Sequence, residues 1–178
     1  MQEIELKILK IDPLEVDTKL LAMGAKKEPT VFVIDKTFDF HNHALAKKNN
    51  ALRLRQMGEK TYITYKGGVQ KGKIANIIEE IETSVGDVVV FELILKKLGM
   101  QCYKHREKKR TSYSLPNIHC EIDEYPGIPP YLEIEGPQKD IQNVVEKLGF
   151  NLSDTTRASV SKVLKKYNIK SDSLKFQE

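Results

Sequence analysis

Pairs of charged residues two positions apart recur along this chain, mostly with an aliphatic residue between them. The first segment is Glu3-Ile4-Glu5-Leu6-Lys7, and the later pairs are Arg53/Arg55, Glu80/Glu82, Lys108/Arg110 and Glu133/Glu135. Residues two apart on a β-strand point to the same face of the sheet. Five strands would therefore each present ions on one face, which predicts a sheet with one charged and one apolar face.

The charged residues fall into two chemical sets. Hard oxygen ligands that suit Mg²⁺ or Mn²⁺ are supplied by Glu3, Glu5, Asp123, Glu133 and Glu135. Cations that can surround a polyanion are supplied by Lys7, Arg53, Arg55, Lys66, Lys108 and Arg110. A metal ion together with arginines and lysines fits phosphoryl transfer, where catalysis consists mainly of positioning and charge neutralisation. A metal-bound water is then the expected nucleophile for hydrolysis.

The elements that must position these residues are strands in hairpin order with helices between them. The predicted strands are 1–11, 30–40, 51–57, 60–66, 76–85, 102–115, 118–125 and 131–136. The predicted helices run from Asp12-Pro13 to Gly24 and over 88–98, 139–148 and 155–167, and a loop is expected at 67–73. We expect one domain over residues 1–170 and a frayed tail over 171–178.

The helices carry apolar stripes, so they should cover the aliphatic face of the sheet. Closing eight antiparallel strands into a barrel would remove the sheet edges and turn the charged face into a lumen. The expected fold is therefore α+β, a closed eight-stranded antiparallel β-barrel, or tunnel, with helices packed outside. The alternative is an open sheet whose charged face is solvated and salt-bridged.

The composition and local patterns argue against three classes of protein, namely zinc-binding, membrane-spanning and nucleic-acid-binding proteins. The chain has 178 residues, a net charge of +4 and 30% charged residues, and Cys102 and Cys120 have no metal-like spacing. We expect a cytoplasmic protein without a membrane segment. The basic segment 104–110 has no aromatic platform, so no dedicated nucleic-acid site is expected. For His119 we expect a role in packing or at the surface rather than zinc ligation.

The ordered motifs resemble the CYTH superfamily, the triphosphate tunnel metalloenzymes, which include class IV adenylyl cyclases, thiamine triphosphatases and inorganic triphosphatases. Residues 3–7 match its ExExK signature. The similarity continues through Thr37–Asp39, Ala51–Arg55, Thr64–Gly67, Glu79–Glu82, Lys108–Tyr113, Ile122–Glu124 and Leu132–Glu135. The resemblance thus covers nearly the whole chain in family order.

The resemblance implies a role for each matching residue. The metal ligands would be Glu3, Glu5, Asp123, Glu133 and Glu135, and the triphosphate ligands Lys7, Arg53, Arg55, Lys66, Lys108 and Arg110. The catalytic group would comprise Glu3, Glu5, Lys7 and Glu135, and Glu80 and Glu82 would support the basic residues or a second metal. Ile78 stands where the family often has a basic residue, and Lys73 is the candidate replacement.

The implied function is that of an enzyme, dependent on Mg²⁺ or Mn²⁺, that acts on a triphosphate such as ATP, inorganic triphosphate or thiamine triphosphate. The spacing resembles the class IV adenylyl cyclase-like group most. Hydrolysis needs water aimed at the γ-phosphate, whereas cyclisation needs the ribose 3′-hydroxyl aimed at the α-phosphate. The shared strand motifs leave both reactions open. A non-catalytic nucleotide- or polyphosphate-binding module is the alternative that Ile78 favours, and a homodimer is an expectation from the resemblance alone.

Overall fold

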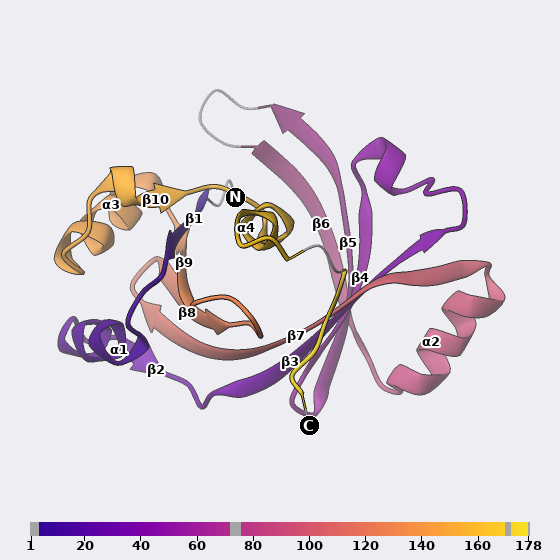
Figure 1. Ribbon diagram of the computed structural model, residues 1–178, viewed down its shortest axis with the longest axis horizontal. Coiled ribbons are helices and arrows are strands. Elements are labelled where there is room, and N and C mark those ends of the chain that lie inside the picture. The colour runs from indigo at the N-terminus through magenta and orange to yellow at the C-terminus, as the bar shows by residue number, and fades with distance from the viewer. Residues whose placement is uncertain (1–3, 72–75, 170–171, 178) are drawn as a thin grey trace. The chain divides into compact units, whose positions relative to one another are not determined.

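The computed structural model describes residues 4–71, 76–169 and 172–177 (Figure 1). These residues form two compact units. Unit 1 comprises residues 1–31 and 108–170, and unit 2 comprises residues 32–107 and 171–178. Each unit has a hydrophobic core of its own. A single domain over residues 1–170 therefore stays a prediction.

The described part of unit 1 is an antiparallel sheet with three α-helices. Its elements are β1 (Ile4–Leu9), α1 (Pro13–Ala22), β2 (Lys26–Lys27), β8 (Ile118–Glu124), β9 (Tyr131–Gly136), α3 (Gln138–Lys147), η2 (Leu152–Asp154), β10 (Thr155–Thr156) and α4 (Val160–Lys166), with the second half of β7 (Met100–Leu115). The hydrogen-bonded strand order is β10-β1-β9-β8-β7. Each neighbouring pair in this order is antiparallel.

The core of unit 1 lies on the aliphatic face of this sheet. Alternate residues of β1, β9 and β8, such as Leu6, Ile134 and Cys120, pack with Val16 and Leu20 of α1 and with residues of α3. Helix α1 begins as predicted, because the side chain of Asp12 accepts hydrogen bonds from the backbone N–H groups of Leu14 and Glu15. The other face of these strands is left to the charged residues.

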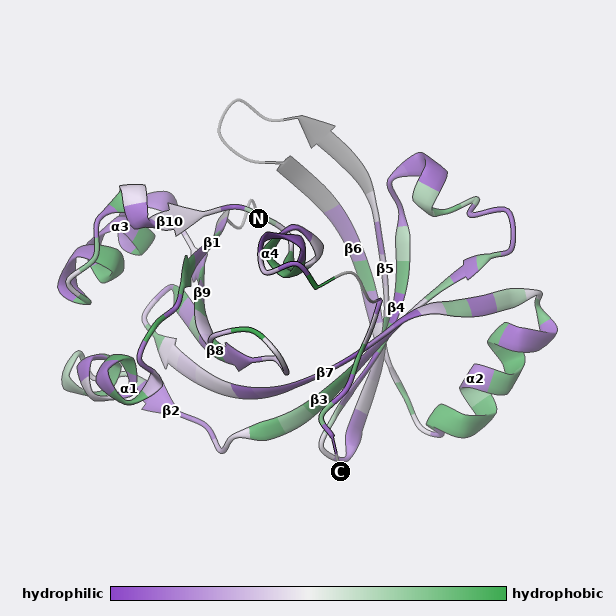
Figure 2. Ribbon diagram, viewed as in Figure 1, coloured by the Kyte–Doolittle hydropathy of each residue, from purple (hydrophilic) through white to green (hydrophobic). Residues whose placement is uncertain are grey.

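Unit 2 contains a second antiparallel set of strands. Its elements are β3 (Val31–Phe40), η1 (Ala46–Lys48), β4 (Ala51–Met57), β5 (Lys60–Lys71), β6 (Asn76–Val85), α2 (Val88–Lys97) and β11 (Ser173–Leu174), with the first half of β7. The strand order is β7-β3-β4-β5-β6. Phe38, Leu54, Leu95 and Met100 form its core. Figure 2 shows that α2 is hydrophobic over most of its length.

The structure corrects two sequence expectations. The last helix begins at Val160 rather than at residue 155, because Thr155 and Thr156 form β10 and pair with Ile8 and Lys7 of β1. These β-branched residues suit an extended strand. The expected loop from Gly67 is strand up to Lys71, since β5 continues along β6 past an irregularity between Gly67 and Gln70. Residues 72–73 lie outside the described part of the chain.

The C-terminal segment, expected to be frayed, is held on β7 over the residues that the structure describes. Strand β11 pairs with His105 and Arg106 of β7 in parallel orientation. Leu174 is buried, and the backbone N–H of Phe176 donates to the carboxylate of Glu107. Burial of one apolar side chain and a charge-assisted hydrogen bond explain why this segment is ordered.

Over the described residues, the predicted fold class is confirmed as a mostly antiparallel sheet with four α-helices. Among the described residues, eight strands are longer than two residues, and these are the eight predicted ones. Closure of these strands into a barrel stays a prediction.

Candidate active site

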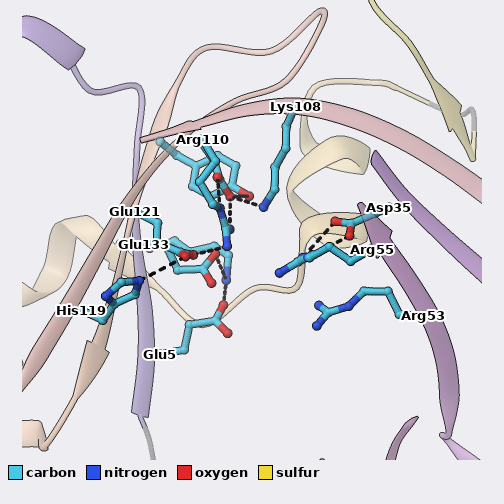
Figure 3. Close-up of polar contacts among 12 residues, drawn as sticks. Glu5, Asp35, Arg53, Arg55, Lys108, Arg110, His119, Glu121 and Glu133 are labelled. Carbon is cyan, nitrogen blue, oxygen red and sulfur yellow. Dashed lines mark hydrogen bonds and ion pairs between the residues drawn. The ribbon is translucent and has the colours of Figure 1, made fainter. Parts of the chain in front are cut away.

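In unit 1, charged residues from β1, β9, β8 and β7 form one row across the sheet (Figure 3). The register places Glu5 opposite Glu135 and Lys7 opposite Glu133. It also places His119 and Glu121 of β8 opposite Glu135 and Glu133. Cross-strand partners share a face of the sheet, so this row lies opposite the helices α1 and α3. Arg110 of β7 completes the row opposite Asp123.

Three of the predicted metal ligands lie together. One carboxylate oxygen from each of Glu5, Glu133 and Glu135 lies within 4.8 Å of the others. Oxygens bound to one Mg²⁺ at ~2.1 Å lie up to ~4.2 Å apart, so small side-chain rotations would bring all three onto one ion. Only oxygen donors are present in this group, which is the set that Mg²⁺ and Mn²⁺ prefer. The residues therefore fit a hard divalent cation.

Lys7 is the buried cation next to this acidic group. It is 2% exposed, and its ammonium contacts the Glu5 carboxylate and lies 3.3 Å from that of Glu133. One ammonium cannot neutralise three carboxylates that lie within contact distance of one another. The acidic group therefore has an excess of negative charge that a cation would relieve.

Asp123 is bound to cations instead of joining the acidic group. It is 0% exposed, and its carboxylate accepts hydrogen bonds from Lys108 at 2.8 Å and from Arg110 at 2.7 Å through both Nε and Nη2. Tyr131 donates a further hydrogen bond at 3.1 Å. Burial alone would raise the pKa of Asp123, but Lys108 and Arg110 outweigh it and hold the pKa at about 2. The structure thus brings together three of the predicted metal ligands without Asp123.

Glu121 and His119 are site residues that the sequence expectations missed. The Arg110 guanidinium pairs with the Glu121 carboxylate, and His119 Nε2 lies 3.4 Å from the same carboxylate. The hydrogen bond to Glu121 raises the pKa of His119 above its usual value, although burial opposes the shift. The period-two run of His119, Glu121 and Asp123 on β8 is the signal that could have identified both.

The carboxyl group of Glu135 has a strongly raised pKa. Burial raises its pKa to about 7, and the neighbouring carboxylates of Glu133 and Glu121 act in the same direction. A carboxyl group must be ionised to bind a metal ion strongly. Metal binding by Glu135 would therefore depend on pH near neutrality.

We expect Mg²⁺ binding to tighten as the pH rises through about 7, because Glu135 must lose its proton first. Affinity at pH 6 should be about tenfold weaker than at pH 8, since the ionised fraction changes by about that factor. Calorimetric titration in two buffers of different ionisation enthalpy measures both the affinity and the released proton. Equal affinities at pH 6 and pH 8 would contradict this expectation.

Unit 2 holds the other predicted triphosphate ligands in a row of its own. The register places Arg55 opposite Asp35, and Arg53 between Thr37 and Thr64. Arg55 donates to Asp35 through Nε at 2.7 Å and Nη2 at 3.0 Å, a bidentate pair (Figure 3). Asp35 was missed, although it lies two residues before Thr37 on the same face of β3. It fixes the plane of the Arg55 guanidinium.

Arg53 is the less satisfied of the two arginines. Its Nη2 lies 3.3 Å from the Thr64 hydroxyl and 3.8 Å from the Glu82 carboxylate, and its Nε is buried without a hydrogen-bond partner. Burial lowers the pKa of Arg53, and the charge of Arg55 adds to this shift. A guanidinium with an unused donor keeps hydrogen-bonding capacity, and the triphosphate-binding role of Arg53 stays a prediction.

The second carboxylate pair lies against Lys66, Thr64 and Arg53, and its supporting role stays a prediction. Glu80 accepts from Lys66 Nζ at 2.6 Å, and Glu82 accepts from the Thr64 hydroxyl at 2.6 Å. Glu3 and Lys73 lie outside the described residues, and so does the side chain of Ile78 in β6. The roles expected for these three residues stay predictions.

Comparison with known proteins agrees with this arrangement. The family model for the CYTH domain matches residues 1–167. This chain belongs to the CYTH domain family. The CYTH domain family binds triphosphate substrates with the help of divalent metals, and its members are adenylyl cyclase-like or triphosphatases. The acidic group of Glu5, Glu133 and Glu135 is the carboxylate cluster in the described part of this CYTH domain whose spacing fits a metal ion.

Individual relatives span almost the whole CYTH domain. A protein of Methanocaldococcus jannaschii named "Putative adenylate cyclase" is 30% identical over 98% of this chain and 94% of its own length. A Pyrococcus horikoshii structure has a TM-score of 0.75 at 24% identity, covering 90% of this chain and 98% of its own. A "putative adenylyl cyclase" from Hippeastrum, described with a dominant triphosphatase activity, has a TM-score of 0.63 at 16% identity and covers 92% and 94%. These two likenesses establish the fold, of which a tunnel barrel is typical.

None of the helices in the described residues combines the length and the hydropathy that crossing a membrane requires.

Proposed function

We propose that this protein is a metal-dependent enzyme that hydrolyses the triphosphate group of a small molecule. The observation that carries the proposal is the acidic group of Glu5, Glu133 and Glu135 beside the buried cations Lys7 and Arg110 on one sheet face. Carboxylates for a metal and cations for phosphate oxygens are the two requirements of phosphoryl transfer.

The roles follow from these contacts. Glu5, Glu133 and Glu135 would hold Mg²⁺ or Mn²⁺, with Glu3 as the further predicted ligand. When bound, the ion would neutralise phosphate charge and lower the pKa of a bound water. Lys7, Lys108 and Arg110 would bind phosphate oxygens, and Asp123 and Glu121 would keep Lys108 and Arg110 oriented toward them.

Arg53, Arg55 and Lys66 of unit 2 keep their predicted role as triphosphate ligands. Each is paired with an acid or a hydroxyl of its own row, which holds the cation without removing its charge. Glu80, Glu82 and Asp35 would act as supports for these cations.

The residue types of the described site favour hydrolysis as the proposed reaction. Carboxylates, lysines and arginines recognise a phosphate chain through charge alone, whereas cyclisation also needs contacts that aim the ribose 3′-hydroxyl at the α-phosphate. The activity described for the Hippeastrum protein supports the same choice. Cyclisation of ATP to cyclic AMP and pyrophosphate is the second candidate, which the name of the M. jannaschii relative favours.

The test is to incubate the protein with inorganic triphosphate, ATP and thiamine triphosphate, each with Mg²⁺ or Mn²⁺ and with a chelator. We expect phosphate release that depends on the metal and is lost in the chelated samples. Cyclic AMP plus pyrophosphate would establish the cyclase instead. Tight binding of all three compounds without turnover would refute the enzyme and support a non-catalytic binding module.

A further inference from the structure

Helix α2 presents a large apolar face to solvent. Its side chains at Val89, Val90, Leu93 and Ile94 and at the C-cap Leu98 are between 48% and 74% exposed. Leu95 is the only fully buried residue of α2, while Val88 and Phe91 are partly buried against the unit 2 core. The green colour of α2 in Figure 2 reflects this composition. The helix thus carries apolar residues on its solvent side as well as on its core side.

The exposed residues form two rows along the helix. Val89 and Leu93 are four residues apart, and Val90, Ile94 and Leu98 follow at the same spacing. A helix that is apolar on nearly all sides is normally buried. The five side chains together expose on the order of 300–400 Å², an area typical of interaction sites. With the flanking polar side chains, two such faces approach the roughly 1,000 Å² of a biological interface.

The charges at the ends of α2 are opposite in sign. Asp87 caps the N-terminus and accepts hydrogen bonds from the N–H groups of Val89 and Val90, while Lys96 and Lys97 occupy the last turn. Glu92 lies between them but pairs with Lys36 of β3. The exposed face is therefore apolar in the middle, acidic at one end and basic at the other.

We propose that α2 packs antiparallel against α2 of a second copy of this chain. A twofold axis through the middle of the helix puts the basic end of each helix beside the acidic end of the other, and it opposes the two helix dipoles. The same axis lays apolar rows on apolar rows, and rows at four-residue spacing interdigitate in the commonest class of helix packing. A second copy supplies both complementarities without any other partner.

The symmetry predicts which residues meet. The row of Val90, Ile94 and Leu98 is centred on Ile94, so Ile94 meets Ile94 of the second copy and Leu93 lies next to this contact. Val90 of one copy faces Leu98 of the other. The Leu98 residues of the two copies then lie roughly 12 Å apart along the helix axis, given a rise of ~1.5 Å per residue.

The first experiment measures molecular mass in solution by sedimentation for the full chain and its variants. We expect a dimer, and we expect Leu93→Glu and Ile94→Glu each to weaken dimerisation at least tenfold while circular dichroism shows a folded chain. Leu14→Glu is the matched control, because Leu14 is 75% exposed on α1. It should leave the dimer intact. A monomeric wild-type chain, or a dimer that both α2 variants leave unchanged, would overturn the proposal.

The second experiment tests the orientation with a short thiol-specific cross-linker in a Cys102→Ser background, since Cys102 is exposed and Cys120 is buried. The Leu93→Cys variant should form a cross-link between position 93 of one copy and position 93 of the other. The double variant Val90→Cys/Leu98→Cys should also form a cross-link between the two copies. Leu98→Cys alone should not. Efficient cross-linking of Leu98→Cys alone would indicate parallel helices and overturn the antiparallel arrangement.

The alternative occupant of the exposed face of α2 is a lipid surface, which a third experiment tests. Vesicles of phosphatidylserine and phosphatidylcholine should not bind the wild-type chain in flotation assays. Binding that Leu93→Glu abolishes, in a chain that sediments as a monomer, would assign the face to membranes and overturn the proposal.

Discussion

Replacing Glu135 by Gln should abolish the metal-dependent turnover of triphosphates while the fold survives. The variant removes one of three clustered carboxylates and keeps the volume of the side chain. We expect a loss of at least about 100-fold in kcat/KM and a clear loss of Mg²⁺ affinity, because the ion loses a charged ligand. Phosphate-release assays and calorimetric metal titration measure the two effects. Glu5→Gln should behave in the same way.

The stability of the Glu135→Gln variant provides an independent readout. The pKa of Glu135 is raised to about 7 in the folded protein, so its ionisation opposes folding as the pH rises from about 4.5 through 7. The neutral variant should therefore unfold with a free energy higher by on the order of 1 kcal/mol at pH 8 in a chelator, and with little change at pH 4. Urea unfolding at the two pH values measures this.

The matched control is Glu146→Gln, which neutralises an exposed carboxylate of α3. It should keep the turnover, the metal affinity and the stability of the wild type. Full activity in Glu135→Gln or in Glu5→Gln would refute the assignment of the acidic group as the metal site.

Replacing Asp123 by Asn should cause the largest loss of stability of any single site substitution. The carboxylate is fully buried, and it neutralises two cations, Lys108 and Arg110, that are themselves buried. Removing the charge leaves those cations uncompensated, which costs about 3–5 kcal/mol when a buried pair is broken. Urea unfolding at pH 7 measures the change, and Glu28→Gln, at an exposed site, is the control.

The same residue sets an acid limit on stability. The pKa of Asp123 is lowered to about 2 by Lys108 and Arg110, so its contribution is fully present above the unfolded value near 4. It is lost as the pH falls from about 5 to about 2, by roughly 2 kcal/mol. The wild type should show this loss in unfolding experiments, and Asp123→Asn should lack it.

Asp123→Asn also separates two roles for this residue. A stable variant with weakened Mg²⁺ affinity would support the metal ligation that the family resemblance implies. An unstable variant whose remaining folded fraction binds Mg²⁺ normally would support the orienting role that the contacts indicate.

Local sequence patterns determined which residues share a face of each strand. The period-two charges of β1, β4, β6, β7 and β9 put Glu5 with Lys7 and Glu133 with Glu135, because side chains alternate along any strand. Likewise, Asp12 followed by proline determined where α1 begins. These features depend only on near neighbours, so they can be predicted without knowledge of the fold. The ordered motifs were also sufficient to predict the family.

The tertiary structure alone decided which charges meet. Acidic residues precede and follow the strand of Arg110 in the sequence. The β-sheet register selects Asp123 and Glu121 among them as its partners. For the same reason Asp123 pairs with basic side chains and does not join the acidic group, and Asp35 pairs with Arg55. Residues 155–156 were predicted as the start of the last helix, and pairing with β1 made them a strand. Pairing between distant segments is a free-energy balance over the whole sheet, and no local pattern contains it.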